Sequence, residues 1–374
     1  MSVTAGVCVA NIYYNQPILK DIAQTFGTNE ARVGVTSVLS QAGYGLGLLL
    51  LTPLGDKVDR KTLILLLQAL LALSLTAMAF ASNFATVVLL STLIGVFAVA
   101  AQVILPMAAS LAGDNKGRTV GFIFTGILSG ILLARVFSGI ITGWLGWRYV
   151  YGIAALMVCM TAATCYMTLP SVKPLFRGTY AELLGSTLKQ IVRFPVLRRT
   201  ALIGALVFGA FCSFWTTLTF HLSGPPFSYS SEVIGLFGIL AVGGALLAPL
   251  FGRLADKGSP QKSQLFAISL LIIAVILIKV FPYALASLVL AVLLLDVGVQ
   301  ATQVTNVATI YTLDEEAHSR VNTVYMTTYF IGGSLGTLAG VQSWGLGGWS
   351  MLTWQLLLWS IAAMVITLWS VKTK

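Results

Sequence analysis

The chain is a succession of long apolar segments separated by short polar stretches. About 20 consecutive apolar residues are enough for a helix to cross the ~30 Å hydrocarbon core of a bilayer. Twelve segments of this kind can be distinguished, at approximately residues 1–19, 32–54, 62–82, 85–111, 118–143, 149–169, 200–222, 232–254, 263–281, 283–311, 321–342 and 350–370. The pattern therefore predicts an all-α membrane protein with twelve transmembrane helices.

The longest polar interval divides these segments into six and six. It predicts an N-terminal six-helix bundle at 1–169, a cytoplasmic linker at 170–199 and a C-terminal six-helix bundle at 200–374. The linker contains an amphipathic run from Ala181 to Phe194, which we expect to form a helix on the membrane surface.

Matching features recur about 200 residues apart. Leu-Gly-Asp-Lys at 54–57 returns as Leu-Ala-Asp-Lys at 254–257, and the interval from an arginine to a Gly-Trp pair, 118–147, returns at 320–349. This repetition predicts two homologous halves related by a pseudo-two-fold axis along the membrane normal. In membrane proteins it is typical of transporters whose substrate site lies between the halves.

Composition and charge agree with a membrane protein. Apolar residues make up 57% of the chain, charged residues only 9%, and the mean hydropathy is +0.91, whereas soluble domains carry about 25% charged residues. The net charge of +10 does not indicate a nucleic-acid partner, because the basic residues are spread over short loops. No cluster of metal ligands, phosphate-binding loop or nucleophile motif is present, so the sequence predicts no metal, no cofactor and no enzymatic activity.

The distribution of lysine and arginine predicts the orientation. Seventeen of them fall on the side that carries both termini, against Lys20, Arg32 and Arg148 on the opposite side, with Lys279 near that side. By the positive-inside rule both termini are cytoplasmic, in a multi-pass protein of the cell inner (cytoplasmic) membrane. The first segment reaches its polar residues only a dozen positions after Met1, so a truncated N-terminus is an open alternative.

The loop between segments two and three carries a recognisable motif. It reads Thr-Pro-Leu-Gly-Asp-Lys-Val-Asp-Arg-Lys at 52–61, and its aspartate and basic residues match the Gly-x-x-x-Asp-Arg-x-Gly-Arg-Arg loop of the major facilitator superfamily. With the twelve segments and the duplicated loop, the chain resembles that superfamily, which implies two pseudo-symmetric six-helix bundles. The glycine-rich fifth segment most resembles the drug:proton antiporter and efflux permease branch.

Two departures from that branch bear on proton coupling. The arginine expected four residues before Gly95 in segment four is absent, and Ser91 stands there. In segment five the expected proline is missing, and Arg135 occupies the position of the last glycine. Proton coupling must therefore come from other residues if it is present.

The loop motif predicts a conformational latch. A carboxylate at Asp56, near the N-terminus of segment three, would be stabilised by free backbone N–H groups and neighbouring basic side chains. Such a latch would hold one conformation and release when the halves rock; the alternative is a loop that is merely anchored in water. Its candidate members are Asp56, Arg60 and Lys61, with Asp256 and Lys257 in the second copy.

Two ionisable residues lie deep inside apolar segments, Arg135 in segment five and Asp296 in segment ten. A charge at the bilayer centre costs about 2.5–3.5 kcal/mol on insertion scales, so each should face protein or a water-filled cavity. We expect them to lie near each other and to couple transport to protons. The alternative is that Arg135 is a structural pin and Asp296 a helix cross-link.

Segments one, four, seven and ten line the central cavity in the fold that the resemblance implies. These segments carry the amide and aromatic residues we predict to contact substrate: Asn11, Tyr14, Asn15, Gln102, Phe211, Trp215, Gln300, Gln303 and Asn306. Glycines at four-residue spacing instead indicate close helix packing: Gly126, Gly130, Gly332, Gly336 and Gly340.

The sequence favours a secondary active transporter that works by alternating access, with proton-coupled efflux of a small, partly hydrophobic or cationic compound. Its expected partners are that small molecule, protons and the lipid bilayer, and we expect a monomer. Two alternatives remain open: an uptake symporter or uniporter for a small polar metabolite, and a non-transporting sensor or decayed remnant.

Overall fold

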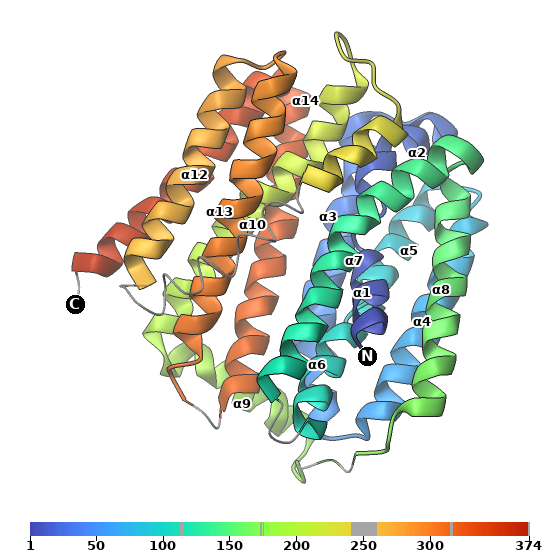
Figure 1. The fold of residues 1–374 in the computed structure, drawn as a ribbon, viewed down its shortest axis with the longest axis vertical. Coiled ribbons are helices and arrows are strands. Elements are labelled where there is room, and N and C mark those ends of the chain that lie inside the picture. The colour runs from blue at the N-terminus through green and yellow to red at the C-terminus, as the bar shows by residue number, and fades with distance from the viewer. Residues whose placement is uncertain (113–115, 173, 175, 241–259, 315–316, 373–374) are drawn as a thin grey trace.

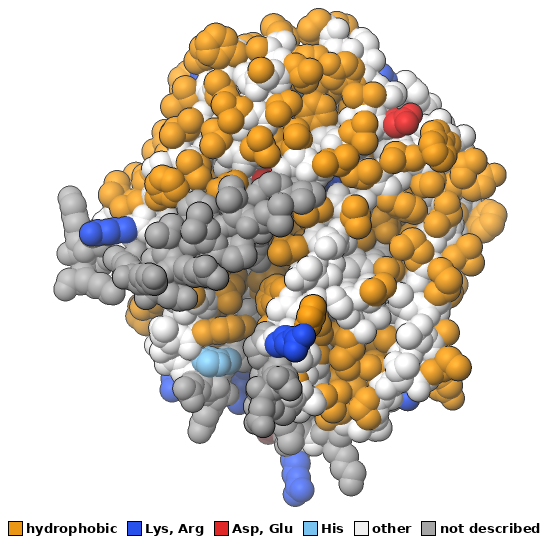
Figure 2. Space-filling view, viewed as in Figure 1, with side chains coloured by type: hydrophobic (Ala, Val, Ile, Leu, Met, Phe, Trp, Pro, Cys, Tyr) orange, Lys and Arg blue, Asp and Glu red, His pale blue; other side chains and the backbone are white. Residues whose placement is uncertain are grey.

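The computed structural model describes residues 1–374 apart from 113–115, 173, 175, 241–259, 315–316 and 373–374 (Figure 1). All regular elements among the described residues are helices. Nine of these helices are long and apolar enough to cross a membrane, counted over the same residues. Large apolar side chains such as Phe80 and Met167 are more than 80% exposed, and apolar side chains cover most of the face in Figure 2. The molecule is a multi-pass membrane protein.

The first half begins with a broken segment and continues with five longer ones. Asn29, Asp59 and Asn83 begin three of the helices, because their side chains accept hydrogen bonds from backbone N–H groups of the first turn. The elements are α1 (Ser2–Ala10), η1 (Gln16–Ile18), α2 (Leu19–Phe26), α3 (Glu30–Leu50), η2 (Thr52–Asp56), α4 (Arg60–Ala79), α5 (Phe84–Phe97), α6 (Ala100–Leu111), α7 (Lys116–Leu145) and α8 (Trp147–Thr168).

Between the halves lies α9 (Tyr180–Arg193), an amphipathic helix that begins with a capping box formed by Thr179 and Glu182. The second half contains α10 (Pro195–Ser223), the helix Ser231–Leu240, α12 (Pro260–Val280), α13 (Leu285–Ile310) and α14 (His318–Lys372). Two predicted segments lie within α14, which is interrupted by non-helical backbone at Gly347 and Gly348. At Gly348 φ is +58°, a conformation that glycine adopts without strain.

The predicted twelve segments correspond to the described helices. Segment one is divided among α1, η1 and α2, and α14 holds segments eleven and twelve. Of segment eight the structure describes the part at Ser231–Leu240. The prediction of an all-α fold is confirmed for the described residues. Cys8, Cys165 and Cys212 are buried, and Cys159 is exposed on α8.

Glycines let helices approach closely in equivalent places of the two halves. Added methyl groups at Gly126 and Gly130 on α7 would overlap the backbone of Ser2 and Gly6 on α1. On α14, methyl groups at Gly332, Gly336 and Gly340 would overlap Ala205, Gly209 and Ser213 of α10. Segment five therefore packs on segment one as segment eleven packs on segment seven, which is the relation a duplicated architecture requires.

The halves contact each other along α3 and α14, which lie side by side. Polar contacts join α2 and the start of α3 to the second half, at the end of the bundle opposite α9 (Figure 1). Lys20 donates to the carbonyl of Ser223 at 3.0 Å, and Trp344 donates to Glu30 at 2.6 Å. Nearer the centre, Ser334 donates to the carbonyl of Val38 at 2.9 Å. In this conformation the halves are joined at the end opposite α9.

The glycine contacts lead to a test of stability. Gly336→Val should lower the midpoint of thermal unfolding of the purified protein, because its side chain would overlap the backbone of Gly209. Overpacking of this kind costs about 1–3 kcal/mol. Gly152→Val on α8 is the matched control, since nothing lies within 4 Å of a methyl group added there. Equal midpoints for the two variants would show that the α10–α14 contact is not tightly packed.

Candidate substrate site

A buried guanidinium lies where the two halves meet. Arg135 on α7 is 1% exposed, and its Nε donates to Oε1 of Gln16 at 2.8 Å. The guanidinium lies over the ring of Trp215, a residue of α10 in the other half, at 4.0 Å from its centroid. Cation–π contact of this kind stabilises a desolvated arginine by about 2 kcal/mol. The rings of Tyr13 and Phe211 lie at 5.3 and 5.8 Å.

Small residues behind Arg135 allow this position. Methyl groups added to Gly235 and Gly238 would collide with the carbonyl and the Cβ of Arg135. The helix Ser231–Leu240 therefore packs directly on the backbone of α7, and the arginine side chain is directed away from it towards Gln16 and Trp215.

Asp296 supplies the opposite charge from α13 in the second half, and it is 2% exposed. It attracts Arg135 electrostatically. Ion pairs among the described residues join Arg60 to Asp56 and Arg193 to Asp314, and none joins Arg135 to Asp296. The two residues expected to lie near each other therefore do not form a direct salt bridge. Gln16 holds the arginine instead, and Oδ2 of Asp296 has no hydrogen-bond partner among the described residues.

Several polar atoms around Arg135 lack hydrogen-bond partners. Around Arg135, four buried donor atoms have no hydrogen-bond acceptor among the described residues: Nη1 and Nη2 of Arg135, Nε2 of Gln16 and Nε1 of Trp215. Buried donors of this kind are costly when they remain unsatisfied. The arrangement can bind an acceptor group, and it contains one carboxylate that can bind a proton or a cation.

Three predicted residues of segment one are engaged by contacts within the first half. Asn11 donates to the carbonyls of Val7 and Cys8 in its own helix. Asn15 donates to Ser40 at 3.3 Å, and Tyr14 packs against Phe137 with ring centroids 5.4 Å apart. These contacts fix the chain between α1 and η1 against its own helix, α3 and α7.

Gln102, which was predicted to contact substrate, lies near the boundary between the halves. Its Nε2 donates to the hydroxyl of Tyr44 at 3.4 Å, and the ring of Tyr44 packs on that of Phe330 at 4.4 Å. Phe208 stacks on Tyr329 at 3.9 Å and on Phe211 at 5.8 Å. Aromatic rings from both halves therefore enclose the centre.

The predicted amides of segment ten differ in their surroundings. Gln300 is half-buried, and Gln303 accepts from the hydroxyl of Tyr329 at 3.4 Å. Asn306 is fully buried and bonds to Gln264, to the carbonyl of Thr200 and to Tyr325. Its position joins α10, α12, α13 and α14 within the second half, which favours a cross-link over substrate contact.

Two site residues were not among the predicted set. Gln16 holds Arg135, and its own carbonyl accepts from Thr219 of the other half at 2.8 Å. Gln41 on α3 accepts from Thr337 of α14 at 3.4 Å, and its Nε2 has no partner among the described residues. The signal for both was an amide within an apolar segment.

Two surface depressions lie elsewhere. Their volumes are about 380 and 700 Å³, and their linings include Asp21 with Trp147 and Lys20 with Trp344 respectively. Both lie beside α2, at the end opposite α9, and neither includes Arg135 or Asp296. The buried centre is therefore the candidate substrate site.

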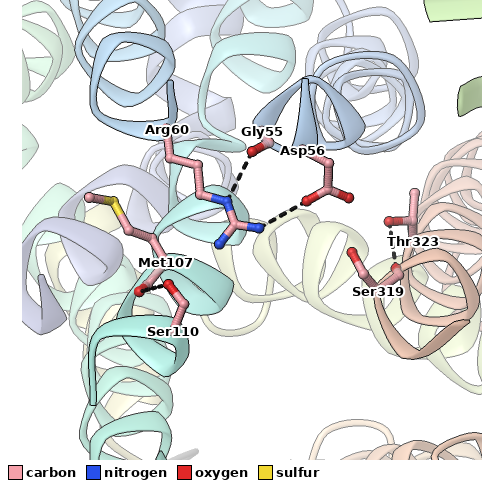
Figure 3. A network of polar contacts seen from close by, with 7 residues as sticks. All are labelled: Gly55, Asp56, Arg60, Met107, Ser110, Ser319 and Thr323. Carbon is pink, nitrogen blue, oxygen red and sulfur yellow. Dashed lines mark hydrogen bonds and ion pairs between the residues drawn. The ribbon is translucent and has the colours of Figure 1, made fainter. Parts of the chain in front are cut away.

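The predicted latch lies at the α9 end. Arg60 binds Asp56 at 2.9 Å and donates from Nε to the carbonyl of Gly55 at 2.9 Å. Figure 3 shows the Asp56 carboxylate between Arg60 and the first turn of α14, where Ser319 and Thr323 lie. Asp56 of the first half thus borders the second half.

The other predicted latch residues are placed differently. Lys61 lies over the ring of Tyr166 at 5.3 Å rather than beside Asp56. Asp256 and Lys257 fall outside the described residues. The carboxylate that caps α4 is that of Asp59, which accepts from the backbone N–H of Thr62 at 3.0 Å, whereas Asp56 contacts the start of this helix through Arg60.

Asp59 also holds the linker. It accepts from the hydroxyl of Ser171 at 3.0 Å and from the amide of Val172 at 2.8 Å. Burial raises the pKa of Asp59, but hydrogen bonds from Thr62, Val172 and Ser171 outweigh it, and its pKa lies below the ordinary 3.8. At the other end of the linker, Arg193 of α9 binds Asp314 in the second half at 2.8 Å. The linker is bound to both halves.

Comparison with known proteins agrees with this geometry. The family model described as Major Facilitator Superfamily matches residues 1–341. The uncharacterized transporter YgaY of Escherichia coli O157:H7 is 38% identical over 94% of this chain and 89% of its own length. A probable sugar efflux transporter of Helicobacter pylori (strain ATCC 700392 / 26695) is 27% identical over 88% of this chain and 84% of its own length.

A solved structure shares the fold. The crystal structure of a bacterial homolog to the human lysosomal transporter Spinster, in an inward-facing and occupied conformation, gives a TM-score of 0.79 at 14% identity. The match covers 100% of this chain and 96% of the chain in that structure. The chain belongs to the major facilitator superfamily. It is a membrane transporter of that superfamily.

The linker contacts lead to a test. Asp59→Ala should speed hydrogen exchange at the Val172 amide roughly fivefold at neutral pH, since this amide donates to Asp59 and losing one hydrogen bond costs about 1 kcal/mol. Asp59→Asn, which keeps a capping oxygen, should change it less. Because the pKa of Asp59 is lowered in the folded protein, its carboxylate stabilises the fold fully above pH 3.8. This stabilisation is lost as the pH falls through the lowered pKa. Unchanged exchange in Asp59→Ala would show that the linker is held by other contacts.

Proposed function

We propose that this transporter exports small, partly hydrophobic compounds that carry a cationic group, in exchange for protons. It works by alternating access as a monomer in the cell inner membrane, with both termini in the cytoplasm. The observation that carries the proposal is the buried pair of opposite charges, Arg135 from the first half and Asp296 from the second.

The placement of the pair on opposite halves gives it a role in coupling. Each charge compensates the other in this conformation, and rocking of the halves changes their separation. A buried charge that loses its counter-charge must find another. For Asp296, that is either a proton or the cationic group of a substrate, and competition between the two for one carboxylate exchanges substrate for protons.

The surroundings support a partly hydrophobic substrate. Phe211, Trp215 and Tyr329 present aromatic surface next to the charges, and aromatic faces favour both apolar groups and cations. A second candidate substrate is a sugar, because amides such as Gln41 have unpartnered polar atoms among the described residues, and relatives from Helicobacter are named probable sugar efflux transporters.

Asp296→Asn tests the coupling. In proteoliposomes with an imposed pH gradient, transport by this variant should lose its dependence on the gradient, because an amide cannot exchange a proton. The measurement is initial rate against pH gradient over a panel of organic cations, amino acids and sugars. Glu182→Gln is the matched control, since it removes a carboxylate but can keep the capping box of α9. Unchanged gradient dependence in Asp296→Asn would leave that residue a helix cross-link.

Asp56→Asn tests the latch. The variant should insert normally but transport at least tenfold more slowly, because a latch biases one conformation and contributes little to folding. Membrane abundance and initial rate are measured on the same preparation. Loss of the protein from the membrane would show that Asp56 is structural.

A further inference from the structure

The centre of the molecule holds more hydrogen-bond donors than it can satisfy. Arg135, Gln16 and Trp215 are 1–3% exposed, and Arg135 contacts both of the others, by its hydrogen bond to Gln16 and its stacking on Trp215. Together they present four donor atoms without an acceptor among the described residues. An acceptor ligand with more than one oxygen would satisfy them.

Arg135 is oriented as a fork for such a ligand. If its role were only to neutralise Asp296, the two would gain most from a direct ion pair, because buried charges are stabilised by close, hydrogen-bonded partners. Instead Gln16 takes Nε, and both terminal nitrogens stay free within the described part of the chain. Two parallel N–H groups match the two oxygens of a carboxylate.

We propose that the transported substrate is a zwitterion of the amino-acid type with an apolar side chain. Its carboxylate binds Nη1 and Nη2 of Arg135, its ammonium group binds Asp296, and its side chain lies against Phe211 and Trp215. This assignment rests on the proposed function and names its substrate class. A carboxylate alone would leave Asp296 without a counter-charge, and an ammonium alone would do the same to Arg135, whereas a zwitterion compensates both.

The assignment also fits proton exchange. The ammonium group and a proton compete for Asp296, so release of the zwitterion on one side leaves the carboxylate free to take up a proton. The carboxylate of the substrate, held by Arg135, discriminates against simple cations that would otherwise satisfy Asp296. Arg135 of the first half then discriminates against cations without a carboxylate, and Asp296 of the second half binds the proton.

Equilibrium binding to the purified full-length protein separates the two contributions. The probes are L-phenylalanine, phenethylamine, which lacks the carboxylate, and 3-phenylpropionate, which lacks the ammonium group. Calorimetry on the unmodified protein should show L-phenylalanine bound at least tenfold more tightly than either analogue, since removing the partner of a buried charge is strongly unfavourable.

Two variants should each lose one preference, either that for L-phenylalanine over phenethylamine or that for L-phenylalanine over 3-phenylpropionate. Arg135→Gln should bind phenethylamine as tightly as L-phenylalanine, and Asp296→Asn should bind 3-phenylpropionate as tightly as L-phenylalanine. If Arg135→Gln does not fold, Arg135→Lys keeps the charge without the fork. That variant should reduce the preference over phenethylamine while keeping the preference over 3-phenylpropionate. Glu182→Gln should bind as the unmodified protein does.

Three results would overturn the assignment: no binding of any probe, tighter binding of a singly charged probe, or equal loss of all three probes in both variants. The binding measurement uses no gradient, so it fails independently of the coupling. A protein that prefers phenethylamine while Asp296→Asn loses gradient dependence keeps the proposed function with another substrate class. A protein with the expected preferences and unchanged gradient dependence in Asp296→Asn keeps the zwitterion site without proton exchange.

Discussion

A guanidinium buried in an apolar bundle must be compensated, and the centre of this protein is arranged around that requirement. Arg135 is held by Gln16, covered by Trp215 and attracted by Asp296. Each contact depends on a particular piece of the fold. Gln16 is available because the first segment changes from α1 to the short helix η1, and Trp215 and Asp296 come from the other half. The compensation of one charge therefore links the two halves and gives their relative position an energetic consequence.

Much of the architecture could be predicted from the sequence because a membrane imposes simple rules. Segment lengths and the duplicated motifs predicted the twelve-segment fold, and Arg135 and Asp296 stood out because charges are costly inside apolar helices. The partner of Arg135 could not be predicted, since it depends on the break at η1 and not on periodicity. Asn306 was expected near substrate, but the sequence could not show that Gln264, Thr200 and Tyr325 surround it.

The loop at the α9 end illustrates the same limit. The motif indicated that Asp56 was important, and it predicted no role for Asp59, three residues later. The structure separates them: Asp59 caps α4 and binds the linker, whereas Asp56 binds Arg60 and borders α14. With Arg193 bound to Asp314, the linker connects the two halves at the α9 end. The assignment of carboxylates to caps or to contacts between halves requires the three-dimensional path of the chain.

The contact between α7 and the helix Ser231–Leu240 has a mechanical meaning. A methyl group added at Gly139 would overlap Ser231, and one at Gly235 would overlap the carbonyl of Arg135, so the two backbones touch with almost no side chain between them. Gly139 lies near the C-terminal end of α7. Two helices in such close contact can rotate about the contact point, where a small rotation produces a large displacement at their far ends. A larger side chain at Gly139 or Gly235 would limit the amplitude of that rotation without altering any charged group.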